Sequence, residues 1–108
     1  MGKFLGVDFN TDNHLENCYQ LFFYANKLKR EISLVQTVHI DLFEMQMRNM
    51  NLNEIDRIIV NDYEDLGNFY VFKQFHNICM AHGLEYSFLK QEIHSDLEIP
   101  VAFLVDSL

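Results

Sequence analysis

The stretch of residues 56–89 constrains the fold more than any other part of the chain. Its apolar, β-branched segment 57–60 is typical of a buried strand. A helical apolar pattern follows and stops at Gly83, where glycine adopts the left-handed conformation of a helix C-terminus without strain. The alternating segment 85–89 predicts a second strand. Together these patterns predict a strand–helix–strand crossover unit, which is the building block of a sheet covered by helices.

The first part of the chain predicts another strand and a long helix. Residues 3–9 are apolar enough for a strand, and N-cap candidates follow them. Apolar side chains then recur at helical spacing and predict an amphipathic helix of about five turns. Phe22, Phe23 and Tyr24 together have more bulk than one helix face can bury, so we expect Phe23 to point elsewhere and to form a self-association surface. The apolar stripe of the helix consists of Leu15, Cys18, Tyr19, Phe22, Ala25 and Leu28.

Residues 31–50 fit two structures. The alternation of Val38, Ile40 and Leu42 is typical of a strand, whereas apolar side chains spaced by three or four residues also fit one face of a helix. We interpret residues 40–50 as a helix with a short extended piece before it.

The C-terminal part of the chain predicts one more strand. Residues 91–98 have the composition of an acidic turn or loop, and Pro100 then opens the apolar segment 101–105. All elements together predict a single domain over residues 1–108. Its fold class is α/β (an α+β sandwich), with a mixed four-stranded sheet and two or three helices packed on it.

The net charge of −8 is distributed unevenly. Residues 1–52 hold five basic and six acidic side chains, a net charge of −1, whereas residues 53–108 hold three basic and ten acidic ones, a net charge of −7. A negative field repels phosphate backbones and anionic membranes, so we expect neither nucleic acid nor a membrane as partner. The acidic half either serves solubility or binds a basic protein. The residues expected to form its partner face are Asp62, Glu64, Asp65, Glu92, Asp96 and Glu98.

Cysteine usage and the N-terminal residues indicate a cytoplasmic protein. Cys18 and Cys79 both lie in apolar helical patterns, where cysteine is a common small buried residue. The segment after Met1 is too short and too soon charged for a signal peptide, and the longest apolar run is far shorter than a membrane span. We therefore expect reduced thiols.

Carboxylates end three of the predicted strands, at Asp8, Asp62 and Asp106. In open α/β sheets ligands bind outside the carboxyl ends of strands, and convergent carboxylates can hold Mg²⁺. Asp62 is the best single candidate because Glu64 and Asp65 crowd it with like charge, which perturbs a pKa. The simpler alternative is that these side chains form turns and helix caps, and in that case the chain has no metal ligands.

The motifs of the common enzyme classes are absent from the sequence. None of the five histidines lies four residues from another, and we assign no Cys/His pair at metal-ligand spacing. The serines lie outside any nucleophile elbow, and there is no glycine-rich phosphate loop. We therefore expect no catalytic residue, no cofactor and a non-enzymatic role.

Four segments of the chain resemble a known family. Residues 58–62 form a short apolar strand with an Asn-containing turn, residues 82–83 end a helix with His-Gly, and residues 101–106 form an apolar strand that ends in Asp. With residues 30–37, which are similar to an Arg-Glu-Val-rich helix, this pattern resembles the YueI-like family of small proteins from Gram-positive bacteria. The resemblance implies a small α/β sandwich related to chorismate-mutase-like and kink-turn-binding ribosomal folds. It implies no activity, because none is established for that family.

The sequence thus predicts a non-enzymatic cytoplasmic protein that acts through protein–protein contacts, as a regulator or as a small acidic inhibitor. We expect the acidic C-terminal half to be its partner face, and the surplus aromatic surface to support a homo-oligomer. The alternative is a small-molecule or divalent-metal-binding domain that uses Asp8, Asp62 and Asp106 at the strand ends.

Overall fold

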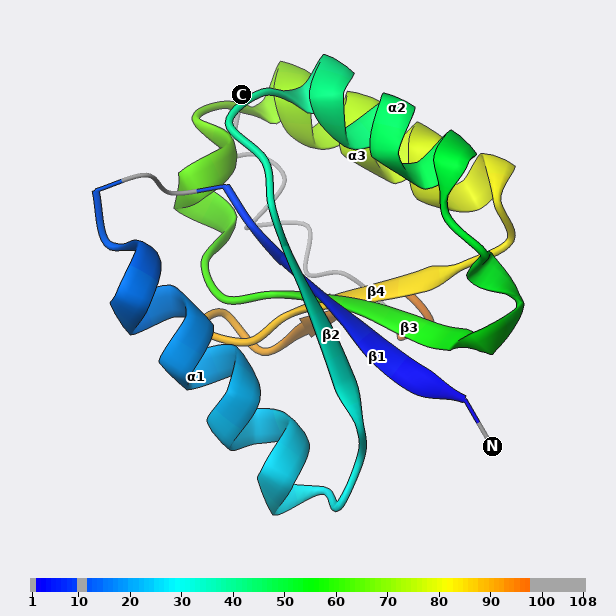
Figure 1. Ribbon diagram of the computed structural model, residues 1–108. Helices are drawn as coiled ribbons and strands as arrows, with labels where there is room; N and C mark the ends of the chain where they lie inside the picture. Colours follow the sequence, from blue (N-terminus) through cyan, green and yellow to red (C-terminus); the bar gives the residue numbers. More distant parts are fainter. Residues whose placement is uncertain (1, 10–11, 98–108) are drawn as a thin grey trace.

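The computed structural model describes residues 2–9 and 12–97 (Figure 1). These residues form three α-helices, two short 3-10 helices and a five-stranded mixed sheet. The predicted α/β class is confirmed, although the expected number of four strands is too low. In chain order the elements are β1 (Lys3–Asp8), α1 (His14–Lys27), β2 (Ile32–Gln36), α2 (Ile40–Asn49), η1 (Leu52–Glu54), β3 (Ile55–Val60), η2 (Tyr63–Leu66), α3 (Phe69–Ala81), β4 (Glu85–Phe88) and β5 (Ile93–His94).

The sheet has the strand order β2-β1-β3-β4-β5, with the first four strands parallel and β5 antiparallel. In β1, Gly6 pairs with Leu34 of β2 on one side and with Ile59 of β3 on the other. The chain leaves β1 for α1 on one face of the sheet, and it leaves β3 for α3 on the opposite face, which α2 also covers (Figure 1). The carboxyl ends of β1 and β3 therefore form a topological switch point, which is where open α/β sheets bind ligands.

The larger hydrophobic core lies between the sheet and the helices α2 and α3. Phe72, Phe75 and Cys79 of α3 are buried there, so the helical apolar pattern before Gly83 is confirmed. Phe43 of α2 stacks on Phe75 with 5.1 Å between ring centroids. A smaller core under α1 consists of Phe4, Leu21, Ala25 and Ile59.

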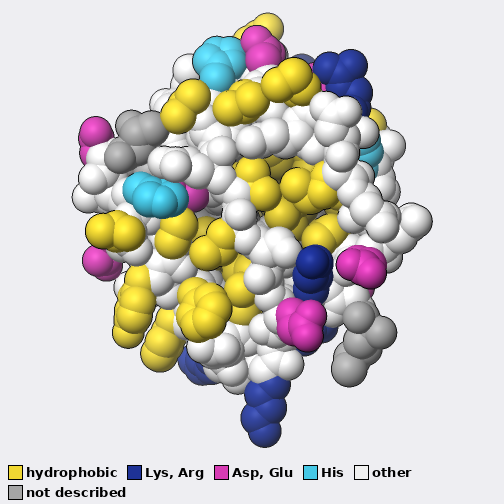
Figure 2. Space-filling model, in the orientation of Figure 1, with side chains coloured by type: hydrophobic (Ala, Val, Ile, Leu, Met, Phe, Trp, Pro, Cys, Tyr) yellow, Lys and Arg dark blue, Asp and Glu magenta, His cyan; other side chains and the backbone are white. Residues whose placement is uncertain are grey.

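Of the apolar stripe predicted for α1, Ala25 is buried against the sheet, whereas most of the other members face outward. The buried residues of this helix are Asn17, Leu21 and Ala25, whereas Tyr19 is 63% exposed and Phe22 is 51% exposed. Phe23 is exposed as expected, and Figure 2 shows hydrophobic side chains on the surface over α1.

The reason for this orientation lies in β1. A Cβ atom added at Gly6 would lie 2.8 Å from a side-chain atom of Leu34, 2.9 Å from one of Ile32 and 3.4 Å from one of Leu21. Because Gly6 has no side chain, the Leu21 face of α1 packs directly on β1. The bulkier aromatic side chains are left on the outer side of the helix.

The strands that the prediction did not count lie at the two edges of the sheet. β2 occupies the short extended piece that was expected before α2, and α2 itself is confirmed as a helix. β5 lies within residues 91–98, which were expected to form a loop, and that expectation is wrong because the buried Ile93 pairs with Phe88. The strand predicted over residues 101–105 lies outside the described residues.

The helix ends follow the local chemistry of the sequence. Gly83 ends α3 with a φ of +67°, as its position predicted. α1 has 14 residues, which makes about four turns rather than the expected five.

None of the helices within the described residues is long and apolar enough to span a membrane.

Candidate functional site

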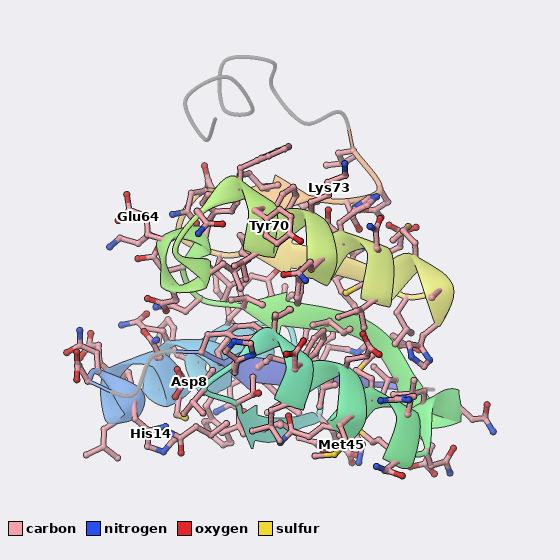
Figure 3. All side chains as sticks on the ribbon, turned by 90° about the horizontal axis from the view of Figure 1, so that it is seen from above. Asp8, His14, Met45, Glu64, Tyr70 and Lys73 are labelled. Carbon is pink, nitrogen blue, oxygen red and sulfur yellow. The ribbon has the colours of Figure 1, made fainter. Side chains whose placement is uncertain are left out.

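Asp8, the last residue of β1, is the buried carboxylate at the switch point. It is 2% exposed, and a buried charge requires polar partners. Its Oδ1 accepts a hydrogen bond from Asn17 Nδ2 at 3.1 Å, and its Oδ2 lies 2.5 Å from Nδ1 of His14. Both partners come from the first turn or two of α1, and Figure 3 shows Asp8 and His14 close together. The prediction that a carboxylate lies at this strand end is confirmed for Asp8.

Asn17 connects Asp8 to the end of β3. Its Nδ2 also donates to Oδ2 of Asp65 at 2.8 Å, and its Oδ1 accepts from Nδ2 of Asn61 at 2.9 Å. The side chain is buried between α1 and the sheet. One neutral amide therefore holds two carboxylates and one further amide in a fixed arrangement, which accounts for a polar residue on the inner face of α1.

Cys18 joins Asp8 and His14 on the other side of this network. Its Sγ lies 3.6 Å from Nδ1 of His14 and 4.0 Å from Oδ2 of Asp8. Burial raises the pKa of the Cys18 thiol, and the negative charge of Asp8 raises it further. Our expectation that no Cys and His lie at metal-ligand spacing is wrong for this pair, since a spacing of four residues places both side chains on one helix face.

A surface pocket of about 450 Å³ opens beside Asn17, between α1 and the segments that follow β3 and β4. Its wall combines aromatic rings, amides and charges of both signs. The lining residues are Asn13, Glu16, Asn17, Gln20, Phe23, Tyr24, Lys27, Asn61, Asp62, Asp65, Leu89 and Lys90.

Asp62 lies on the wall of this pocket, and its contacts are with η2 and with the segment after β4. Its Oδ1 accepts from Nε2 of Gln91 at 2.7 Å and from the backbone N–H of Glu64 at 2.9 Å, and Nζ of Lys90 lies 3.4 Å from Oδ2. Burial raises the pKa of Asp62, but the bonds from Gln91, Glu64 and Lys90 outweigh it and hold the pKa below its usual value. Asp62 thus caps η2, which was the simpler alternative.

The strand-end carboxylates of the metal hypothesis therefore bond to different partners. Asp8 and Asp62 reach the same edge of the sheet, but Asp62 bonds to Gln91 and Lys90. Asp65, which was predicted for the partner face, is tied to Asp8 through Asn17. Asp106 lies outside the described residues.

The other residues of the predicted acidic face occupy different elements. Glu64 is exposed in η2 (Figure 3), and Glu92 precedes β5. Asp96 lies 2.6 Å from Nη2 of Arg57, and the hydrogen bond from Arg57 lowers the pKa of this carboxyl. Glu98 lies outside the described residues.

A second polar network ties β5 to the sheet. Ser87 is fully buried, and its Oγ lies 2.7 Å from Nδ1 of His94 and accepts from Nη1 of Arg57 at 3.0 Å. The same guanidinium donates to the carbonyl oxygen of Tyr86. These bonds join β3, β4 and β5, so the burial and partners of Ser87 fit a structural role.

The residues that sequence reasoning missed at the site are His14, Asn17, Cys18 and Asn61. The spacing of His14 and Cys18 was visible in the sequence, whereas the approach of Asp8 to both depends on how α1 packs on β1. Asn17 lies outside the apolar stripe predicted for this helix, so its burial could not be inferred from the periodicity.

No protein-family model matches the chain, and neither the curated proteins nor the solved structures contain a significant match to it. The resemblance to the YueI-like family stays a prediction.

Proposed function

We propose that the chain is a ligand-binding domain whose binding site is the pocket beside Asn17. The observation that supports this function most directly is the position of the pocket. It lies at the carboxyl ends of the strands, where the connections leaving β1 and β3 diverge to opposite faces, and it has the size of a small-molecule site.

The lining suggests a planar heterocycle that carries N–H donors, as nucleobases do. Phe23 and Tyr24 offer ring faces for stacking, and the carboxylate and amide oxygens around Asn61 and Asp65 accept hydrogen bonds. Phosphate is disfavoured because the net charge of the chain is −8 and the acidic residues of the lining outnumber Lys27 and Lys90. We therefore propose a nucleobase or nucleoside rather than a nucleotide.

Phe23 and Phe22 make a matched pair of variants for testing this function. Both are about half exposed on α1, and only Phe23 lines the pocket. Nucleobases, nucleosides and nucleotides are screened by thermal unfolding and then titrated by calorimetry. A ligand at a hundred times its dissociation constant raises the free energy of unfolding by about 2.7 kcal/mol. We expect Phe23→Ala to weaken binding and Phe22→Ala to leave it unchanged. The proposal fails if no compound raises the unfolding temperature, or if both variants bind alike.

A second candidate function is contact between two copies through α1. Its specific observation is the exposed stripe of Leu15, Tyr19 and Phe22, because large apolar side chains on one helix face mark an interaction surface. In an antiparallel pair of α1 helices, Tyr19 of one copy lies beside Phe22 of the other, and Glu16 lies near Lys27. This pairing would bring apolar side chains together and place opposite charges near each other, as a two-fold interface requires.

Light scattering at low and high salt tests this second function. We expect a dimer that persists at high salt, since the contact is mainly apolar. Phe22→Ser should give a monomer, and Val38→Ser, at an exposed position outside α1, should not. A monomeric wild-type chain would exclude self-association through this face.

The acidic C-terminal half as a face for a basic protein stays a prediction, and charge reversal of Glu64 in pull-down experiments tests it.

A further inference from the structure

The side chains of Asp8, His14 and Cys18 converge at the N-terminal end of α1. One oxygen, one nitrogen and one sulfur atom from the three residues all lie within 4.8 Å of one another. None of the three residues lines the pocket described above. The cluster is therefore a separate arrangement, and it does not depend on the proposed small-molecule function.

The donor types decide which ligand this cluster suits. Imidazole nitrogen and thiolate sulfur are preferred by late first-row transition metals, whereas Mg²⁺ and Ca²⁺ require oxygen ligands throughout. A single carboxylate together with His and Cys is within the ligand set that zinc uses. We propose that Asp8, His14 and Cys18 form a zinc-binding site.

The distances between the donor atoms are close to those of a tetrahedral site. Bond lengths to zinc of about 2.0–2.3 Å place neighbouring donors about 3.3–3.6 Å apart. Nδ1 of His14 lies 3.6 Å from Sγ of Cys18, and Oδ2 of Asp8 lies 4.0 Å from the same sulfur. On metal binding the separation of 2.5 Å between His14 and Asp8 must widen, and that of 4.0 Å between Asp8 and Cys18 must shorten slightly. The side chain of His14 is 40% exposed and has room for this movement.

The surroundings hold all three ligands in place. His14 and Cys18 are one turn apart on α1, so the helix backbone fixes their spacing. Oδ1 of Asp8 accepts a hydrogen bond from Asn17, and this bond turns Oδ2 toward His14 and Cys18. Outer hydrogen bonds of this kind orient metal ligands and raise affinity.

The number of ligands indicates the kind of zinc site. The described residues supply three donors, and zinc sites with three protein ligands take water as the fourth. His14 and Cys18 are both partly exposed, so water reaches this position. Zinc at this site would therefore have an exchangeable water molecule as its fourth ligand.

Cobalt substitution tests the site on the full chain. Metal-free protein, kept reduced, is titrated with Co²⁺ and followed by absorption. We expect one equivalent to bind, with the intense visible bands of tetrahedral Co²⁺ and a thiolate-to-cobalt charge-transfer band in the near ultraviolet. One equivalent of Zn²⁺ should then remove both signals.

Two pairs of variants assign the signals to residues. Cys18→Ser should abolish the charge-transfer band, and Cys79→Ala, which removes the other thiol from the α3 core, should retain it. His14→Gln should raise the dissociation constant by more than the roughly 10–100-fold that loss of an outer hydrogen bond costs. His82→Gln, at the C-terminal end of α3, should leave it unchanged. Circular dichroism in the presence of a chelator verifies that each variant folds.

The proposal fails if Co²⁺ gives no charge-transfer band with the wild-type chain. A band that survives in Cys18→Ser, or disappears in Cys79→Ala, also overturns it. Because His14 lies on the surface, His14→Gln tests the site even if a cysteine variant does not fold. Loss of nucleoside binding in the Phe23 experiment would leave all these outcomes unaffected.

Discussion

The face of the sheet covered by α2 and α3 and the face covered by α1 are built from different kinds of side chain. The first is closed by aromatic rings in mutual contact, among them Phe43, Phe75 and Tyr86. The second has a small apolar core, and next to it lie the buried polar residues Asp8 and Asn17. Burial of apolar area is the main source of stability, so most of it lies on the α2/α3 face.

The difference between the faces indicates how a small domain can hold a cluster of buried polar groups. Buried polar groups are tolerated only when they are hydrogen-bonded, and each group at the end of β1 has such partners. Because the aromatic core lies on the opposite side of the sheet, changes near Asp8 should affect the proposed binding sites without removing the main support of the fold. The predictions below test this division.

The largest effect is expected for Phe75→Ala. Phe75 is fully buried, and its ring contacts those of Phe43, Tyr86 and Phe88. Removing it leaves a cavity in the larger core, which costs about 3–5 kcal/mol of the free energy of unfolding. Urea denaturation measures this loss. A loss smaller than about 1 kcal/mol would show that the α2/α3 face is not the main support.

A matched pair of leucines compares the two faces directly. Leu5 belongs to the larger core and Leu21 to the smaller one, and both are almost fully buried. We expect Leu5→Ala to cost about 4 kcal/mol and Leu21→Ala about 2–3 kcal/mol, because the smaller core has far fewer buried residues than the larger one. Denaturant midpoints of the two variants give the comparison. Equal losses would contradict the assignment of stability to one face.

The polar network at the switch point predicts a smaller effect. Asn17→Ala removes the shared partner of Asp8, Asp65 and Asn61, and unsatisfied buried groups cost about 1–3 kcal/mol. Asn26→Ala is the control, since it is the same change on the exposed side of the same helix and should stay within about 0.5 kcal/mol. Thermal unfolding of both variants tests the prediction. Indistinguishable variants would mean that the network adds no stability.

The smallest effect is a dependence of stability on pH through Asp62. Its pKa is lowered in the folded chain, so its contribution is complete above the unfolded pKa of about 3.9 and is lost as the pH falls through the folded pKa. Asp62→Asn should therefore reduce the acid dependence of stability by less than about 1 kcal/mol. Glu64→Gln is the neighbouring control. Denaturation curves from neutral to acidic pH measure the difference, and identical curves for wild type and Asp62→Asn would refute it.

The sequence identified the crossover unit because each of its signals acts locally. Gly83 requires a helix end, and the β-branched run in β3 requires burial wherever the strand lies. The edge strands gave weaker signals, since β2 is largely half-buried or exposed and β5 has only two residues. Local pattern therefore predicted the centre of the fold better than its edges.

The orientation of α1 and the composition of the site depend on contacts between distant residues. Periodicity showed that α1 has an apolar stripe, but the packing of Leu21 on Gly6 decided which face is buried. Asp8 could be placed at a strand end from the sequence. Its partners could not, because they depend on that same orientation of α1.

The position of β1 inside the sheet has a consequence for the order of folding. β1 is the first strand of the chain, yet its partners are β2 and β3, and the pairing with β3 reaches as far along the chain as Val60. Loops of this length must close before the centre of the sheet gains its contacts, and such closure slows folding. On a ribosome, the first strand emerges well before its second partner and waits with one edge unpaired.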